Sequence, residues 1–216
     1  MAIGAEEAVD VSVSDVVNPN SGIVDDDMIL SYNAVTSNFN VWAKSSAKGD
    51  EWKPLTTVTK SGISVEAAES SSFAPGKAFW LVRNAPGDYI YLVGRYTGQD
   101  YVFDLEGGTA ENPGHTLVAN PTMYDIDLND LVFVDGEGKT ATPAAGDRIV
   151  TQDISGVQTV YFRHGKTGEW GRNVPTKVGN RTKQVWTKGG TIPAGTGFWY
   201  NRTAAEALKI RFGGAR

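Results

Sequence analysis

The side chains best suited to act as catalytic bases are two histidines, His115 and His164, in a chain that has no cysteine. A nucleophilic serine needs an adjacent base and a group that orients this base. Neither histidine recurs in the other half of the chain, and the sequence contains no GxSxG, HExxH or glycine-rich phosphate loop. We therefore expect no enzyme, no catalytic residue and no cofactor. A carboxylate pair of the glycosidase type stays open as an alternative, because the fold sets its separation.

Six tryptophans offer a second kind of chemistry, the stacking of flat indole rings on sugar rings. Trp186 is the strongest candidate, because basic residues precede and follow it. Trp52 and Trp170 each follow a glutamate after a turn, where they either cap a core or lie exposed. The candidate ligand-binding residues are Trp186, Trp170, Trp52, Lys183 and Arg181. Of these, Arg181, Lys183 and Trp186 would form a basic, aromatic surface of the second unit together with Lys188 and Arg202.

Two further tryptophans, Trp80 and Trp199, stand next to Phe79 and Phe198. Successive side chains of a strand point to opposite faces, so one ring of each pair must face the core. These pairs therefore favour a structural role in the core over a role in ligand binding.

Three consecutive carboxylates, Asp25, Asp26 and Asp27, supply the oxygen ligands that calcium prefers. Their spacing does not match an EF-hand loop. We therefore expect solvated turn residues and no metal site.

Strands are expected along most of the chain, since alternating apolar and polar residues are typical of half-buried strands. The expected strands are residues 9–17, 29–32, 39–43, 78–82, 89–95, 101–108, 124–131, 149–152, 159–163, 197–201 and 208–212. Glycine, proline and asparagine clusters mark the turns between them. Helical patterns are short and cover residues 65–70 and 203–208 only.

The chain reads as a tandem duplication with an offset that drifts between 115 and 120 residues. Residues 1–17 align with 116–132, residues 27–30 with 147–150, and residues 72–83 with 191–202. Repeats of this kind build architecture. The predicted fold class is all-β, with two similar units, 1–108 and 109–216, each a small antiparallel sandwich or open barrel. Residues 101–108 are expected to link the units and have no counterpart after the second, which leaves an unmatched strand edge.

Charge is unevenly distributed within the net value of −5. Residues 146–216 hold 12 Lys and Arg against 4 Asp and Glu, whereas residues 1–145 hold 8 against 21. Unlike patches of this kind steer association, so a partner is one explanation and drift between duplicated units is the other. No apolar run is long enough for a membrane-spanning helix, and no nucleic-acid motif is present. Residues 1–7 lack a signal-peptide pattern, but Met1 aligns inside the repeat, so a removed leader is compatible with the sequence.

Three segments carry a resemblance to a known group: TIPAGTGFWY (residues 191–200), HTLVANPT (115–122) and AFWLVR (78–83). They resemble secreted two-repeat β-domain proteins of the Lentisphaerae and Verrucomicrobiota type, over nearly the whole chain. The resemblance implies export or a cell-surface location. It brings no catalytic or binding residue, because no function is established for the group.

These observations favour a non-catalytic structural or interaction module that is exported and associates head to tail as a homo-oligomer or filament. The first alternative is a glycan-binding β domain that uses the exposed tryptophans. The second is a hydrolase with a carboxylate pair.

Overall fold

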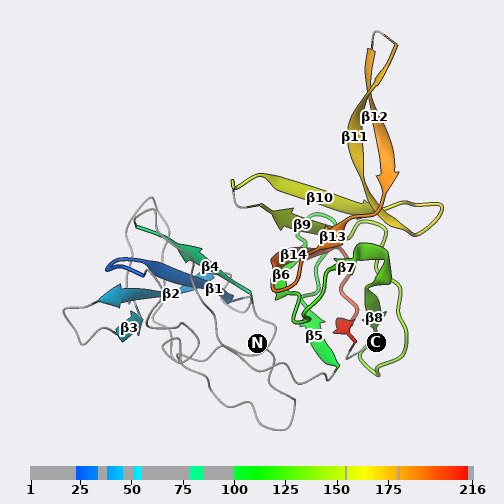
Figure 1. Cartoon of the computed structure of the whole chain (residues 1–216). Coiled ribbons are helices and arrows are strands. Elements are labelled where there is room, and N and C mark those ends of the chain that lie inside the picture. The colour runs from blue at the N-terminus through cyan, green and yellow to red at the C-terminus, as the bar shows by residue number, and fades with distance from the viewer. Residues whose placement is uncertain are drawn as a thin grey trace. The chain divides into compact units, whose positions relative to one another are not determined.

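The computed structural model describes residues 23–33, 38–45, 51–54, 78–84, 100–153, 155–179 and 181–213 (Figure 1). It is all-β, and its strands pair in antiparallel sheets. The chain divides into two compact units, Met1–Gly98 and Gln99–Arg216, which we describe separately. None of the described residues belongs to a helix long and apolar enough to cross a membrane.

The first unit contains a four-stranded sheet in the order β3-β2-β1-β4. Its strands are β1 (Met28–Asn33), β2 (Asn38–Ser45), β3 (Glu51–Pro54) and β4 (Phe79–Val82). Ile29, Trp42 and Trp52 form the core on one face, and Phe79 and Leu81 pack against it. These apolar residues recur at alternate positions of their strands, as a half-buried sheet requires.

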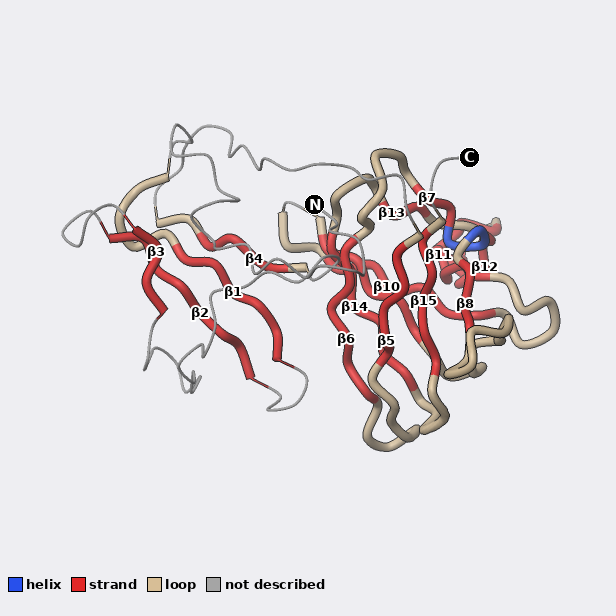
Figure 2. The backbone as a smooth tube through the Cα atoms, turned by 90° about the horizontal axis from the view of Figure 1, so that it is seen from below, coloured by secondary structure: helices blue, strands red, loops and turns tan. Residues whose placement is uncertain are grey.

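The second unit is built on a six-stranded sheet in the order β12-β11-β10-β9-β14-β6. Its strands are β6 (Gly114–Ala119), β9 (Arg148–Gln152), β10 (Gln158–Arg163), β11 (Trp170–Val178), β12 (Arg181–Lys188) and β14 (Gly197–Arg202). A three-stranded sheet has the order β5-β15-β8, and a short pair joins β13 to β7. These strands are β5 (Tyr101–Leu105), β7 (Ile126–Asp127), β8 (Val132–Val134), β13 (Thr191–Ile192) and β15 (Leu208–Phe212). Figure 2 shows that the only helical element drawn in this unit is one short turn, the 3-10 helix η2 (Leu128–Asp130).

The two larger sheets of the second unit pack through aromatic rings. Phe198 and Tyr200 of β14 are 1% and 0% exposed. The Tyr200 ring lies 5.7 Å from that of Phe133 on β8, and the Phe198 ring lies 6.4 Å from that of Phe212 on β15. Edge-on and tilted contacts at these separations are favourable for aromatic pairs. The second unit is therefore built of packed antiparallel sheets, which agrees with the sandwich among the two forms predicted for it.

Four strands of each unit share an order and a register. The order β3-β2-β1-β4 corresponds to β11-β10-β9-β14. Ile29 pairs with Trp42 on one side, and Ile149 pairs with Tyr161 in the same way. This agreement supports the predicted duplication over these strands.

A buried aspartate precedes the first strand of each set. Asp27 and Asp147 are both 0% exposed. Asp27 accepts a hydrogen bond from Asn84 N at 2.7 Å and pairs with Arg83 Nε at 2.8 Å. Burial of a carboxylate is tolerated only when charge and hydrogen bonds compensate it.

The second aspartate repeats these contacts. Asp147 accepts from Thr203 N at 2.8 Å and lies 3.7 Å from Arg202 Nη1. Both carboxylates also accept from the backbone three residues earlier, at Val24 and at Ala144, at 3.1 Å. The expectation of a solvated turn is therefore wrong for Asp27, whose carboxylate fixes the end of β4 to the start of β1.

Several expected elements differ in the structure. The strand expected over residues 124–131 is only β7, because the Asp127 carboxylate accepts from Asn129 N and starts η2. The helix expected over residues 203–208 is absent there, and β15 begins at Leu208. The linking strand of residues 101–108 is β5, which pairs with β15 inside the second unit. The elements expected at residues 9–17, 65–70 and 89–95 lie outside the described residues.

Candidate functional site

Strands β11 and β12 extend past the sheet as a two-stranded hairpin (Figure 1). β11 pairs with β10 only at Trp170 and Gly171, whereas its register with β12 continues to Val178. We call residues 172–187 the arm. A two-stranded hairpin is marginally stable by itself in water. The arm is therefore a structure that a partner surface would stabilise.

The arm is uniformly positive. Its sequence contains Arg172, Lys177, Arg181 and Lys183 and no Asp or Glu. All four of these residues are exposed, and none forms an ion pair within the described parts of the chain. The Arg172 guanidinium lies 6.0 Å from the centre of the Tyr161 ring, which orients it through a cation–π contact.

Each face of the arm has its own character. Val174 pairs with Val185, and Val185 is 41% exposed. Val178, four pairs further on and on the same face, is 49% exposed. Trp186 pairs with Asn173 and so lies on the opposite face. One face therefore combines exposed valines with basic side chains, and the other carries the indole.

Both edges of the arm resist the addition of another strand. Pro175 interrupts the outer edge of β11, where a missing N–H leaves no partner unsatisfied. Arg181 and Lys183 lie on β12, the edge strand of the sheet, and charged edge residues discourage pairing. A partner of the arm would accordingly contact its faces.

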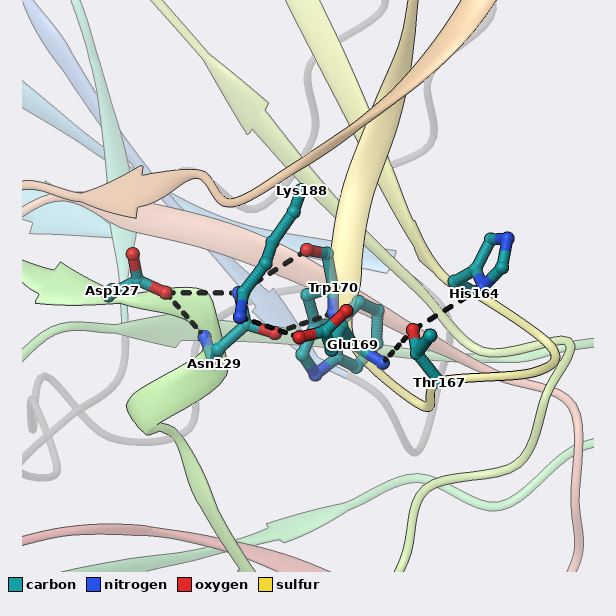
Figure 3. A network of polar contacts seen from close by, with 7 residues as sticks. All are labelled: Asp127, Asn129, His164, Thr167, Glu169, Trp170 and Lys188. Carbon is teal, nitrogen blue, oxygen red and sulfur yellow. Dashed lines mark hydrogen bonds and ion pairs between the residues drawn. The ribbon is translucent and has the colours of Figure 1, made fainter.

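The base of the arm is anchored by Asn129 (Figure 3). Asn129 Oδ1 accepts from Trp170 N at 2.7 Å, and Asn129 Nδ2 donates to Trp170 O at 3.3 Å. Asp127 in turn accepts from Asn129 Nδ2 at 3.1 Å. The Trp170 ring is 3% exposed and contacts Phe133 and Tyr200. The arm thus starts from a fixed point in the core.

An ion pair lies on the surface at the same base. Lys188 Nζ and Glu169 Oε1 are 2.6 Å apart. The hydrogen bond from Lys188 lowers the pKa of Glu169, and the same bond raises the pKa of Lys188. Both groups are therefore charged over a wide pH range.

A hollow of about 570 Å³ opens where the arm departs from β10. Arg148 of β9, Gln158, Val160 and Phe162 of β10, and Asn173 of β11 line it. We call this hollow the notch. The exposed Arg148 forms no ion pair within the described ranges. The notch therefore offers a cation, an amide and apolar surface together.

The structure separates the predicted ligand-binding residues. Lys183 and Arg181 are exposed on β12, as a surface role requires. Trp186 is half-buried, with its ring 4.6 Å from that of His164. These three stay candidates.

Trp52 and Trp170 do not lie exposed, so the prediction that they bind a ligand as surface platforms is wrong. They are 9% and 3% exposed, because each stands where its strand enters the sheet and turns its ring into the core. Arg202 also leaves the predicted basic surface, since its side chain is 4% exposed beside Asp147. The alternative in which the two tryptophans cap a core describes them correctly.

The histidines lie in separate places. His115 Nδ1 is 2.8 Å from Asn201 Oδ1, and His164 Nδ1 is 3.3 Å from Thr167 Oγ1. No three His, Asp or Glu side chains of the described residues come together as a metal site. The hydrolase alternative stays a prediction.

Comparisons with known proteins add no relative. No family model matches the chain, and searches of curated proteins and of solved structures found no match. The resemblance to secreted two-repeat proteins, with the export it implies, therefore stays a prediction.

Sequence reasoning identified part of the arm but not its form. The signal was available, because residues 170–188 contain five basic residues and no acid around the turn at Gly179. Gly179 has a φ of 61°, which two-residue hairpins require at this position. The notch had no sequence signal, since it arises from the divergence of two strands.

Proposed function

We propose that this chain is a non-catalytic interaction module that associates head to tail with copies of itself through the arm. The observation that carries the proposal is a free-standing ribbon with exposed valines and four unpaired cations among the described residues. A marginal hairpin gains stability when a partner covers one of its faces. Export, which rests on the resemblance alone, is part of the same proposal.

The charge pattern favours a second copy as the partner. Residues 1–145 hold 21 acids against 8 basic residues, a charge balance opposite to that of the arm of another copy. A contact between two unlike patches is heterologous, and it produces rings or open filaments. Electrostatic complementarity also sets the rate and register of such association.

The test is light scattering coupled to size exclusion at two ionic strengths. At about 0.01 M salt the Debye length is about 30 Å, and at about 1 M it is about 3 Å. We expect assemblies at low salt that dissociate at high salt. A monomer at high protein concentration under both conditions would refute the proposal.

Charge reversal locates the contact. The arm variant Lys183→Glu and the matched variant Lys139→Glu change the net charge equally, and both lysines are exposed. We expect Lys183→Glu to weaken assembly at least several-fold, and Arg181→Glu with Lys183→Glu to abolish it. Equal weakening by Lys139→Glu would show that total charge, and not the arm, controls association.

A glycan-binding module is the second candidate, because the indole of Trp186 is half-buried and leaves part of its ring exposed. That part of the ring would stack on a sugar. The test is a change of tryptophan emission on titration with a glycan panel. Binding should be lost in Trp186→Ala. No response across the panel would exclude this function.

A further inference from the structure

The edge of β10 that faces the notch carries unpaired backbone groups. Asp153 N donates to Val157 O at 3.0 Å, which sets the phase of hydrogen bonding between β9 and β10. Bonded and non-bonded pairs alternate along an antiparallel ladder. By this alternation Gln158, Val160 and Phe162 direct their backbone N–H and C=O groups away from β9.

The pairing with β11 confirms this phase. His164 N donates to Glu169 O at 2.8 Å, so the alternating position Phe162 also faces β11, where it pairs with Gly171. Val160 and Gln158 face the same side, but no strand of the described residues pairs with them there. Val160 is 43% exposed.

Pro175 accounts for the divergence of β11. If the register of Phe162 with Gly171 continued, Asn173 would pair with Val160, and Pro175 with Gln158. Proline has no N–H to donate at that bonded position, so the ladder cannot close there. β11 instead continues only with β12, and the edge of β10 stays open.

The side chains around this open edge select for an acidic strand. Arg148 pairs with Phe162 across the sheet, which places its guanidinium on the face that Val160 and Phe162 share. Arginine binds carboxylates in a bidentate geometry. An extended segment that pairs with β10 would therefore place apolar residues on Val160 and Phe162 and a carboxylate on Arg148.

We propose that the notch is a strand acceptor, in which an extended, acidic segment of a second copy adds to the edge of β10 at Gln158 and Val160. Strand addition of this kind takes affinity from backbone hydrogen bonds and specificity from alternate side chains. The inference rests on the proposed self-association and gives it a defined acceptor. The acidic balance of residues 1–145 is the reason for assigning the occupant to a second copy.

The decisive variant is Val160→Pro, which removes the outward N–H and should break no bond of the β9–β10 ladder. Val160→Thr is the matched control, because it keeps the N–H and the β-branched shape. Arg148→Glu is a second variant that leaves the backbone unchanged. Near-ultraviolet circular dichroism checks that each variant keeps its aromatic packing.

Two readouts are measured for each protein. The first is assembly at low salt. The second is anisotropy of a fluorescent eight-residue peptide, Val-Thr-Asp-Thr-Val-Thr-Asp-Thr, whose valines and aspartates lie on one face of a strand. The control peptide carries lysine at the two aspartate positions. We expect the acidic peptide to bind and to compete with assembly, and we expect Val160→Pro and Arg148→Glu to weaken both readouts at least tenfold. Val160→Thr should retain both.

The outcomes separate this inference from the proposed function. If Val160→Pro assembles like the unmodified chain while Arg181→Glu with Lys183→Glu does not, the strand acceptor is wrong and the arm contact stands. If the unmodified chain never assembles, the proposed function is wrong. Assignment of the occupant to a second copy then also fails, even where the acidic peptide binds. Equal binding of both peptides would overturn strand addition. Displacement of the acidic peptide by an acidic sugar, which has no peptide backbone to pair with β10, would overturn it as well.

Discussion

The four-stranded sheet of the first unit and the matching strands of the second unit are alike on one face and differ on the other. On the shared face, Ile29 and Ile149 occupy the same register position and are both 0% exposed. On the other face, Val41 is 3% exposed, whereas its counterpart Val160 is 43% exposed. The core-facing pattern is therefore the same in the two sheets, whereas their opposite faces differ.

The divergence has a clear origin in side-chain type. In the first unit the rings of Tyr32 and Phe39 lie 5.4 Å apart, and the Phe39 ring lies 5.5 Å from Trp80. The counterparts of Tyr32 and Phe39 are Gln152 and Gln158, which pair with each other and are exposed. Aromatic residues bury a large area, whereas glutamine stays hydrated. The second sheet thus presents an open face next to its arm.

The largest expected effect comes from removing the buried carboxylate that precedes the first strand of each four-stranded set, Asp147 or Asp27. Asp147→Ala leaves Arg202 buried without its partner and removes an acceptor from Tyr200 Oη, which donates to Asp147 at 2.8 Å. Loss of one member of a buried ion pair costs about 3–5 kcal/mol. Asp27→Ala should cost less, because the Arg83 side chain is 21% exposed and partly hydrated. Urea unfolding of the full chain measures both, and a larger loss for Asp27→Ala would contradict the comparison.

A pH difference between the units should follow from Tyr200, whose first-unit counterpart is Leu81. Burial raises the pKa of Tyr200, and the neighbouring Asp147 charge adds to the rise. Its stabilising contribution is full below the unfolded pKa of about 10 and is lost as the pH rises above it. The second unit should lose up to about 1.4 kcal/mol per pH unit there.

Urea unfolding followed between pH 9 and pH 12 measures this loss, with Tyr200→Phe as the control for ionisation. The slope should be smaller in Tyr200→Phe, which has no group to ionise at this position. An unchanged slope in that variant would assign the alkaline loss to other groups.

A smaller effect distinguishes the two outer faces directly. Val41→Thr buries a hydroxyl in a nearly closed site, which costs about 1–3 kcal/mol when the hydroxyl finds no partner. Val160→Thr, at the corresponding exposed position, should change stability by no more than about 0.5 kcal/mol. Thermal and urea unfolding compare the pair. Equal costs would mean that the outer face of the second sheet is covered in solution.

The smallest effect is expected at the base of the arm. The lowered pKa of Glu169, caused first by its hydrogen bond from Lys188, means that its contribution is present above the unfolded pKa and is lost as the pH falls through the folded value. The protection of the Trp170 and Gly171 amides from hydrogen exchange, taken relative to the intrinsic exchange rate at each pH, should therefore fall at acidic pH. Glu169→Gln should remove most of this dependence, and a dependence that persists in the variant would point to a different anchor.

Sequence alone predicted the all-β class and the correspondence of β1, β2, β3 and β4 with strands of the second unit, because the alternation and spacing of apolar residues recur in both halves of the chain. It also predicted that one ring of each Phe-Trp pair faces the core, as Phe198 does at 1% exposure. It did not place Asp27 and Asp147 as buried structural carboxylates, since their arginines lie more than 50 residues away. It left open whether Trp52 and Trp170 cap a core or lie exposed, because their exposure depends on tertiary packing.

The candidate site was partly accessible for the same reasons. Lys183, Arg181 and Trp186 lie close together in sequence, so local pattern sufficed to select them. The notch depends on Pro175 failing to bond opposite Gln158, a relation between strands that only their register reveals. Long-range register is set by the whole sheet and is weakly encoded in any single segment.

The most direct test of the account is sedimentation equilibrium of a chain in which residues 173–186 are replaced by the dipeptide Asn-Gly. This change joins Arg172 to Thr187, which are already paired, by a two-residue hairpin turn. The account predicts that the shortened chain keeps its core and is monomeric at low salt, where the unmodified chain assembles. Assembly of the shortened chain with undiminished affinity would contradict the role of the arm.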